Sequence, residues 1–369
     1  MPRGQVLSTS ISSFTEAWHK EAEERKLILL DKQRNLGDNH PETLDAMEDV
    51  AWLHNELGDY RSARDLRVTV LETYQILQGE DDPRTLHAMH ALGGTYGALG
   101  QFKEAHEVME LALEKQRKIL GENHPATART LGFLAFTYQD LGQLNKALKL
   151  AISAVEKHSQ FLGEDHSDTL WSMHILADIY CELGQFTEAE DQYHIVVEKI
   201  IRILGENHPN TLRAMGGLGK TYLASGQLKK AEDLLTVVFG KRKTVLGEEH
   251  PDTLNTMGEL ASTYRQWGRL SAAEELATVS LEKHQKVYGE QHPDTLWIMG
   301  GLASIFRKQD QLERAEELLV AVLGKERNFF GNDHPHIRWT MEELANLYRR
   351  MGKLQAAEEL ERFIEDQEV

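Results

Sequence analysis

Seven histidines stand at one position of a repeated segment, and they are the most numerous candidates in the chain for metal ligands. They are His40, His124, His166, His208, His250, His292 and His334, and Asp82 takes the same position in one further copy. A metal site needs three or four ligands that converge on one point, whereas these side chains occur once per 42 residues. We therefore expect each histidine to cap or pack against the helix that follows it, and we expect no metal or other cofactor.

A glycine-rich segment at residues 215–224 could in principle hold phosphate. Its string Gly-Gly-Leu-Gly-Lys-Thr resembles the phosphate-binding loop of nucleotide-binding proteins. Such a loop must follow a strand and open a helix, so that its backbone N–H groups point at the phosphate. Here the segment lies inside a helical pattern, and Ala214 stands where the motif needs a glycine. We expect a helix at this place and no nucleotide.

Cys181 is the only cysteine, and to act as a nucleophile it would need a neighbouring base. No catalytic signature surrounds it, and the sequence shows no Ser–His–Asp order and no paired catalytic carboxylates. The chain is therefore expected not to be an enzyme. The alternative is an enzyme or a small-ligand receptor that uses a groove of the fold as its pocket.

A repeat of 42 residues positions all these side chains. The string Gly-acidic-x-His-Pro-x-Thr-Leu recurs eight times, with its glycine at Gly37, Gly79, Gly121, Gly163, Gly205, Gly247, Gly289 and Gly331. Self-similarity at such a period indicates stacked supersecondary units. In the first copy the glycine suits a helix C-cap and Pro41 suits a first helical turn. Gly58 ends the first helix, and a second helix runs from near Tyr60 to Gly79, so each copy is a helix–turn–helix.

Fixed columns within the repeat carry a family resemblance. Counted from the Thr position, the fourth residue is large and apolar, the eighth is small, the eleventh is aromatic in seven copies and the twentieth is always alanine. This pattern resembles the tetratricopeptide repeat (TPR). The length of 42 residues and the linker string resemble the kinesin-light-chain-like variant, which also occurs in fungal and bacterial multi-repeat arrays. The resemblance implies an all-α fold, a right-handed α-solenoid of about eight repeats.

The same pattern divides the chain into segments. We expect residues 1–13 to be a flexible N-terminus, residues 14–36 to form an N-terminal capping helix, and residues 37–369 to form eight repeats of one continuous solenoid, the last of them truncated. This division predicts seventeen helices.

The overall charge narrows the class of partner. Lys plus Arg number 41 and Asp plus Glu number 59, so the net charge is −18, which disfavours nucleic acid. No apolar run approaches the length of a membrane span, so no membrane partner is expected. A single cysteine and the absence of an Asn-x-Ser/Thr sequon are consistent with a cytoplasmic location.

The resemblance implies that positions 2, 5, 9, 12 and 13 of each first helix face the concave groove. The candidate partner-binding residues among them are Trp52, Phe136, Trp171, His174, Arg213, Lys220, Arg265, Trp297, Arg307, Lys308, Trp339 and Arg349. The tryptophans are interpreted either as anchors for a partner or as side chains half-buried at the groove edge. Four glycines at position 5 indicate close approach, either by a neighbouring helix or by a ligand.

Charge in these groove positions changes sign along the chain. Repeats one to four contribute six acidic residues and one basic residue, and repeats five to eight contribute seven basic residues and one acidic residue. The sequence therefore predicts a protein–protein interaction scaffold whose basic half binds an acidic peptide or protein segment. Neutralisation of the basic residues by acids of the same chain is the alternative, and self-association through the groove or the open ends is a further expectation.

Overall fold

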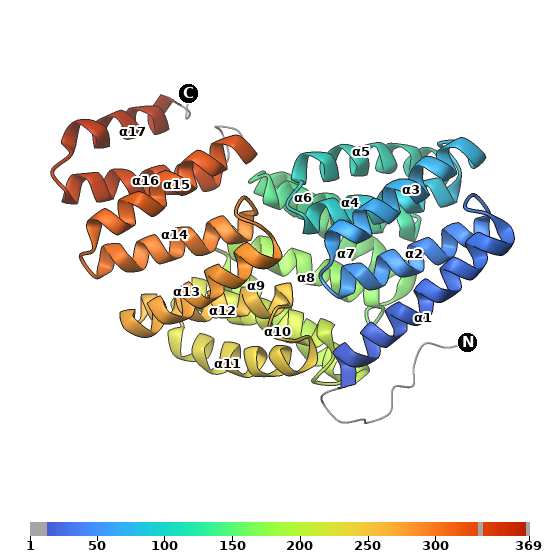
Figure 1. Cartoon of the computed structure of the whole chain (residues 1–369), viewed down its shortest axis with the longest axis horizontal. Helices are drawn as coiled ribbons and strands as arrows, with labels where there is room; N and C mark the ends of the chain where they lie inside the picture. The colour runs from blue at the N-terminus through green and yellow to red at the C-terminus, as the bar shows by residue number, and fades with distance from the viewer. Residues whose placement is uncertain (1–12, 331–334, 367–369) are drawn as a thin grey trace.

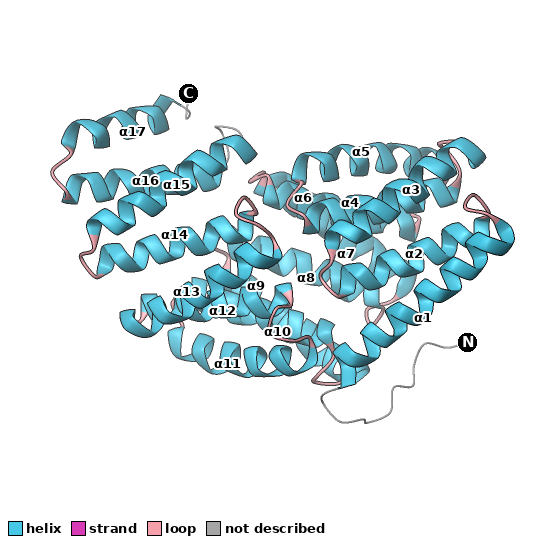
Figure 2. Ribbon diagram, in the orientation of Figure 1, coloured by secondary structure: helices cyan, strands magenta, loops and turns pink. Residues whose placement is uncertain are grey.

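The computed structural model describes residues 13–330 and 335–366, which form seventeen α-helices and no strand (Figures 1 and 2). The predicted all-α solenoid of helix–turn–helix repeats is confirmed. Residues 1–12 of the predicted flexible N-terminus lie outside the described residues, as does the last linker with His334. In chain order the helices are α1 Ser13–Leu36, α2 Pro41–Glu56, α3 Tyr60–Gln78, α4 Pro83–Ala98, α5 Phe102–Ile119, α6 Pro125–Asp140, α7 Leu144–Leu162, α8 Ser167–Glu182, α9 Phe186–Leu204, α10 Pro209–Ala224, α11 Leu228–Val245, α12 Pro251–Gln266, α13 Leu270–Val287, α14 Pro293–Lys308, α15 Leu312–Phe330, α16 Pro335–Arg350 and α17 Leu354–Asp366.

Each residue of the repeated linker string has a structural role, which the first copy illustrates. Gly37 has φ +87°, a conformation that favours glycine. His40 Nδ1 accepts a hydrogen bond from Glu42 N at 3.3 Å, and Pro41 follows as the first helical residue. Thr43 Oγ1 donates to Gly37 O at 2.8 Å and so holds the linker against the helix. The string therefore specifies a helix start.

The same cap recurs in the other described linkers. Asp82 makes it in repeat two, and the expected histidines make it in the rest, namely His124, His166, His208, His250 and His292. The prediction that the linker histidines cap helices is confirmed for these residues. The alanine at the twentieth position is fully buried in all eight copies, which lets the two helices of a repeat approach closely.

The solenoid winds so tightly that its first two repeats contact the sixth and seventh. His250 Nε2 lies 3.0 Å from Glu56 O, and His292 Nε2 lies 3.4 Å from Ala98 O. In both histidines Nδ1 accepts the capping hydrogen bond, so Nε2 carries the proton and donates to the carbonyl oxygen. We call this contact between successive turns of the superhelix the seam.

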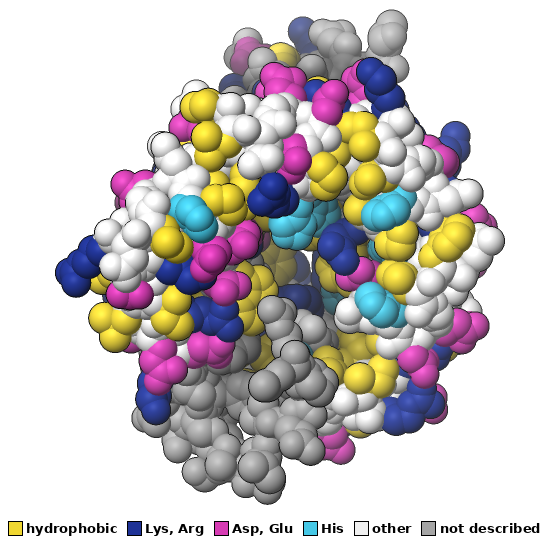
Figure 3. All heavy atoms as spheres, turned by 90° about the vertical axis from the view of Figure 1, so that its right-hand side faces the viewer, with side chains coloured by type: hydrophobic (Ala, Val, Ile, Leu, Met, Phe, Trp, Pro, Cys, Tyr) yellow, Lys and Arg dark blue, Asp and Glu magenta, His cyan; other side chains and the backbone are white. Residues whose placement is uncertain are grey.

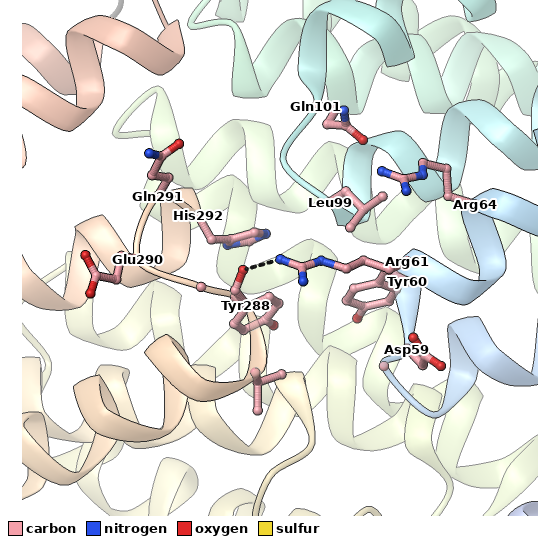
Figure 4. Close-up of a pocket in the computed structure, with 13 residues that line it drawn as sticks. Asp59, Tyr60, Arg61, Arg64, Leu99, Gln101, Tyr288, Glu290, Gln291 and His292 are labelled. Atoms are coloured by element: carbon pink, nitrogen blue, oxygen red, sulfur yellow. Dashed lines mark hydrogen bonds between the residues drawn. The ribbon is translucent and has the colours of Figure 1, made fainter.

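Further contacts complete the seam. Arg61 Nη2 donates to Tyr288 O at 3.4 Å across it (Figure 4). Pro251 lies so close to Gly58 that a Cβ atom added there would sit 2.5 Å from the proline Cδ. Helix α1 also contacts α11, again five repeats along the chain. A cavity of about 500 Å³ lies within the seam and is lined by residues of both turns.

Candidate functional site

The seam closes one turn of the superhelix around a hollow, which we call the channel. Seen from the right-hand side of Figure 1, the surface is hollowed at its middle, and basic, acidic and histidine side chains surround the hollow (Figure 3). Because turns of the superhelix stack, residues of repeat one reach residues of repeats five and six across this space. The channel is therefore the concave surface on which the predicted site residues should meet.

Charged side chains from five repeats meet in the channel, and we call them the acidic core. They are Glu56, Asp140, Asp178, Glu182, Asp252 and Glu259, with Arg213, Lys220 and Arg242 among them.

One wall of the acidic core belongs to helices α8 and α10. Tyr193 Oη donates to Asp178 at 2.7 Å, and Gln139 Nε2 donates to Glu182 at 2.8 Å. Lys220 Nζ lies 3.4 Å from the same Glu182 carboxylate. Burial acts to lower the pKa of Lys220, but Glu182 and Asp178 outweigh it and raise that pKa above its ordinary value. Lys220 therefore stays charged.

A second group of contacts in the acidic core is organised around Asp252. Its carboxylate lies 3.7 Å from Arg213 and 3.8 Å from Arg242. Burial acts to raise the pKa of Asp252, but the two guanidinium groups outweigh it and hold that pKa below the ordinary value. Glu56 approaches from repeat one, and there burial raises the pKa although Arg213 opposes the rise.

Two carboxyls of the acidic core have raised pKa values. Burial raises the pKa of Glu259 to about 7, although Arg242 and Lys220 oppose the rise. Burial, followed by repulsion from Glu182, raises the pKa of Asp140 well above its usual range. Both shifts arise first from burial, which disfavours the charged carboxylate.

The inner face of repeats six and seven has the opposite character, and we call Arg265, Arg307 and Lys308 the basic end. Arg307 Nη2 lies 3.1 Å from Glu343, whereas Arg265 bonds Ser304 Oγ at 3.3 Å and Lys308 bonds the backbone oxygen of Arg265 at 3.2 Å. Burial lowers the pKa of Lys308, and the two arginines lower it further. The Nε atoms of both arginines are buried without a hydrogen-bond partner.

Arginines farther along the array are neutralised locally. Arg349 makes two hydrogen bonds to Glu361, at 2.8 and 2.6 Å, and Arg350 lies 2.8 Å from Asp310. Arg265, Arg307 and Lys308 therefore lie together, whereas Arg349 pairs with Glu361 on α17, the last helix.

Three of the predicted tryptophans explain three of the position-5 glycines. Trp171 packs on Gly132 and Trp297 on Gly258, and a Cβ atom added to either glycine would lie 2.6 Å from the indole ring. Trp339 packs on Gly300 in the same way. The close approach thus comes from a side chain of the next repeat, while Trp297 and Trp339 remain about 40% exposed, at 39% and 41%. The fourth glycine, Gly216, instead faces the guanidinium of Arg242.

The remaining predicted residues are dispersed along the inner face. Trp52 is 45% exposed on α2, and Phe136 is half-buried against Gly97. His174 Nε2 lies 3.4 Å from Asp178 in the acidic core, where burial lowers the pKa of the imidazole.

Sequence reasoning missed Asp252, Glu259 and Arg242. Asp252 and Glu259 stand one residue before and six residues after Thr253, outside the positions expected to face the groove. A signal was present for Glu259, because the same position is apolar or glycine in most other copies. Arg242 lies on the second helix α11, outside the positions counted, and its guanidinium bonds Asp252 O and Thr256 Oγ1.

The other motifs singled out in the sequence lie inside helices. The glycine-rich segment lies within α10, as expected, and Cys181 is buried, which raises the pKa of its thiol. Within residues 13–330 and 335–366, no three His, Cys, Asp or Glu side chains are grouped so as to hold a metal ion. None of the described helices is long and apolar enough to cross a membrane.

Comparison with known proteins agrees with this architecture. Models of the tetratricopeptide repeat match residues 127–194 and 174–239 in one form, and residues 85–126, 253–294 and 295–336 in another. No protein of curated description matches the chain. Among solved structures, a putative kinesin light chain with nearly identical TPR-like repeats from Podosopora anserina is 32% identical, over 55% of this chain and 95% of its own, with a TM-score of 0.43.

Two other solved structures resemble nearly the whole chain. A Rap protein complexed with Competence and Sporulation Factor is 15% identical, over 97% of this chain and 99% of its own, with a TM-score of 0.61. The Rap conjugation gene regulator of plasmid pLS20, in complex with the Phr* peptide, is 12% identical, over 99% and 96%, also with a TM-score of 0.61. These two likenesses show the fold. The repeat models cover more than half of the sequence, and the chain therefore belongs to the tetratricopeptide repeat family.

Proposed function

We propose that the chain is an interaction scaffold that holds a partner peptide or protein segment in its channel, with an acidic part of that segment at the basic end. The observation that carries the proposal is the pair of buried, unpartnered Nε atoms on Arg265 and Arg307. Buried donors are normally satisfied, so these two favour a ligand with carboxylate oxygens.

The charge balance at the basic end supports the same ligand. Three cations lie beside one carboxylate, Glu343, and that carboxylate is 3.1 Å from Arg307. A hydrogen bond to a charged group is worth about 1.5–3 kcal/mol, so one carboxylate of the partner would be held measurably. The complexes of a Rap protein with Competence and Sporulation Factor and of the pLS20 Rap regulator with the Phr* peptide support this use of the fold by analogy only.

A binding measurement with one matched pair of variants tests the proposal. A fluorescein-labelled, glutamate-rich peptide of about ten residues would be titrated with the protein, and its glutamine version would serve as the uncharged control. We expect Arg307→Gln to weaken binding roughly tenfold, because a charge-assisted contact is lost. Arg349→Gln should change little, since Glu361 already neutralises that arginine. Equal affinity of wild type and Arg307→Gln for the acidic peptide would refute the proposal.

A further inference from the structure

Buried side-chain atoms without a hydrogen-bond partner differ in type between the basic end and the acidic core. At the basic end they are donors, the Nε atoms of Arg265 and Arg307. In the acidic core they include two acceptors, Gln139 Oε1 and Glu259 Oε2, whereas Asp252 Oδ2 is ion-paired with Arg213 and Arg242. Arg242 Nε is an unpartnered donor there, but the Nη1 atom of that guanidinium is bound to Asp252 O and Thr256 Oγ1. The acidic core thus has hydrogen-bond acceptors without a partner, whereas the basic end has donors without a partner.

Gln139 gives the clearest sign that a donor belongs in the acidic core. Its side chain comes from position 12 of repeat three, and the residue is only 7% exposed. Its Nε2 donates to Glu182 Oε1 at 2.8 Å, which places the amide within the core and leaves Oε1 unpaired. A buried amide oxygen without a donor loses the hydrogen bond that it would make in water, so a ligand that supplies an N–H would restore that bond.

Charge points to a cationic donor. Six carboxyl groups of the acidic core face three basic groups, Arg213, Lys220 and Arg242. The core can also be reached from the channel, because the side chains of Lys220 and Glu182 are 42% and 35% exposed. An alkylammonium group carries one positive charge and three N–H donors, so it supplies both the charge and the donors that the acidic core lacks.

We infer that the acidic core is a subsite for an alkylammonium group, either a lysine side chain or the N-terminal amine of the bound segment. The inference rests on the proposed function, because it names a second chemical feature of the same ligand. The ammonium lies near Gln139, Glu182 and Glu259, while the acidic part of the segment lies at the basic end. The two subsites together fix the direction in which the segment runs through the channel.

Protonation of Glu259 offers an independent readout. The groups that face this carboxyl are Asp178 from α8, Tyr193 from α9, Lys220 from α10, Arg242 from α11 and Asp252 from α12. Its pKa of about 7 means that it is partly protonated near neutral pH. An ammonium ion favours the ionised carboxylate, so its binding releases protons and tightens as the pH rises from 6 to 8.

The experiment uses the full chain and three probes in isothermal titration calorimetry. The probes are n-butylammonium chloride alone, the acidic peptide with one added lysine, and the same peptide with that lysine acetylated. N-terminally acetylated versions separate a lysine from the terminal amine as the source of the ammonium. We expect acetylation of the preferred amine to weaken binding roughly tenfold, the loss of one charge-assisted contact.

Matched variants assign the effect to the acidic core. Glu259→Gln and Glu182→Gln should each weaken butylammonium binding, and Glu259→Gln should also abolish the proton release. Glu198→Gln, an exposed carboxylate on α9, is the control and should leave binding unchanged. Circular dichroism melting checks that each variant is folded. Because there are two core variants, the test still works if one of them does not fold.

The outcomes separate this inference from the proposed function. If the acidic peptide binds through Arg307 but acetylation of its amines changes nothing, the ammonium subsite is wrong and the scaffold function stands. If butylammonium binds and Glu259→Gln removes that binding while no peptide binds, the subsite stands and the peptide function fails. Butylammonium that binds equally well to wild type and to both core variants overturns the inference.

Discussion

The linker histidines of repeats three and four have one role, and those of repeats six and seven have two. His124 and His166 cap their helices through Nδ1 and are exposed. His250 and His292 make the same cap, and their Nε2 atoms also bind the ends of α2 and α4 one turn away. One local string can therefore serve the helix start in every repeat and the closure of the superhelix in only some of them.

The turn glycines allow the strongest test of this difference. Gly58 and Gly184 occupy the same place in repeats one and four, with φ of +80° and +74°. Alanine at either position incurs the left-handed cost of about 1–2 kcal/mol. At Gly58 the new Cβ also meets Pro251 Cδ at 2.5 Å, whereas at Gly184 nothing lies within 4 Å. Overpacking adds about 1–3 kcal/mol, so we expect Gly58→Ala to lower the melting temperature more than Gly184→Ala does.

Small-angle X-ray scattering gives the second readout for this pair. Gly58→Ala should increase the radius of gyration, because the clash separates the two turns at the seam. Gly184→Ala should leave the radius unchanged. Equal effects of the two substitutions on both measurements would show that the seam does not constrain Gly58.

The period of the sequence predicted what each repeat does locally but not how the turns meet. Gly37, His40, Pro41 and Thr43 act within one linker, so their spacing was enough to assign helix starts. Closure depends on small rotations that accumulate over five repeats, and no single residue encodes them. For that reason the contact of Glu56 with groups from repeats five and six could not be foreseen.

The division of charge along the sequence likewise predicted only part of the candidate site. Position counting found the basic end, and it also included Arg349, which α17 neutralises. It assigned Asp178 and Lys220 to opposite halves, yet the two side chains lie in one core because consecutive repeats stack. Glu259 was missed because position 6 was not counted as part of the inner face, although burial there raises the pKa of its carboxyl to about 7.

Replacing histidine by aspartate separates the two roles of the linker residue. Asp82 caps α4 by accepting from Arg84 N at 2.8 Å, so aspartate keeps the cap. It cannot donate to a carbonyl across the seam, and a lost hydrogen bond costs about 1 kcal/mol. We expect His250→Asp to lower the melting temperature measurably and His124→Asp to leave it nearly unchanged. Thermal unfolding followed by circular dichroism checks both, and a larger loss in His124→Asp would contradict the assignment.

The smallest effect that we expect from the seam is on how the melting temperature changes with pH. Burial lowers the pKa of His250 and of His292 below the ordinary 6.5, even though Asp252 and Asp294 respectively oppose the shift. A histidine whose folded pKa is depressed stabilises the fold fully above about pH 6.5, and that contribution is lost as the pH falls through the folded value. The physical reason is that protonation would place a charged imidazole in the buried seam. We therefore expect the melting temperature of wild type to fall more between pH 7 and pH 5 than that of the His250→Asp/His292→Asp variant, whose carboxylate caps stay ionised over this range.

The His124→Asp/His166→Asp variant, altered at linkers outside the seam, is the matched control. If it reduced the acid sensitivity as much as the seam variant does, the pH response would belong to capping in general, and the distinction between the two groups of linkers would lose its energetic basis.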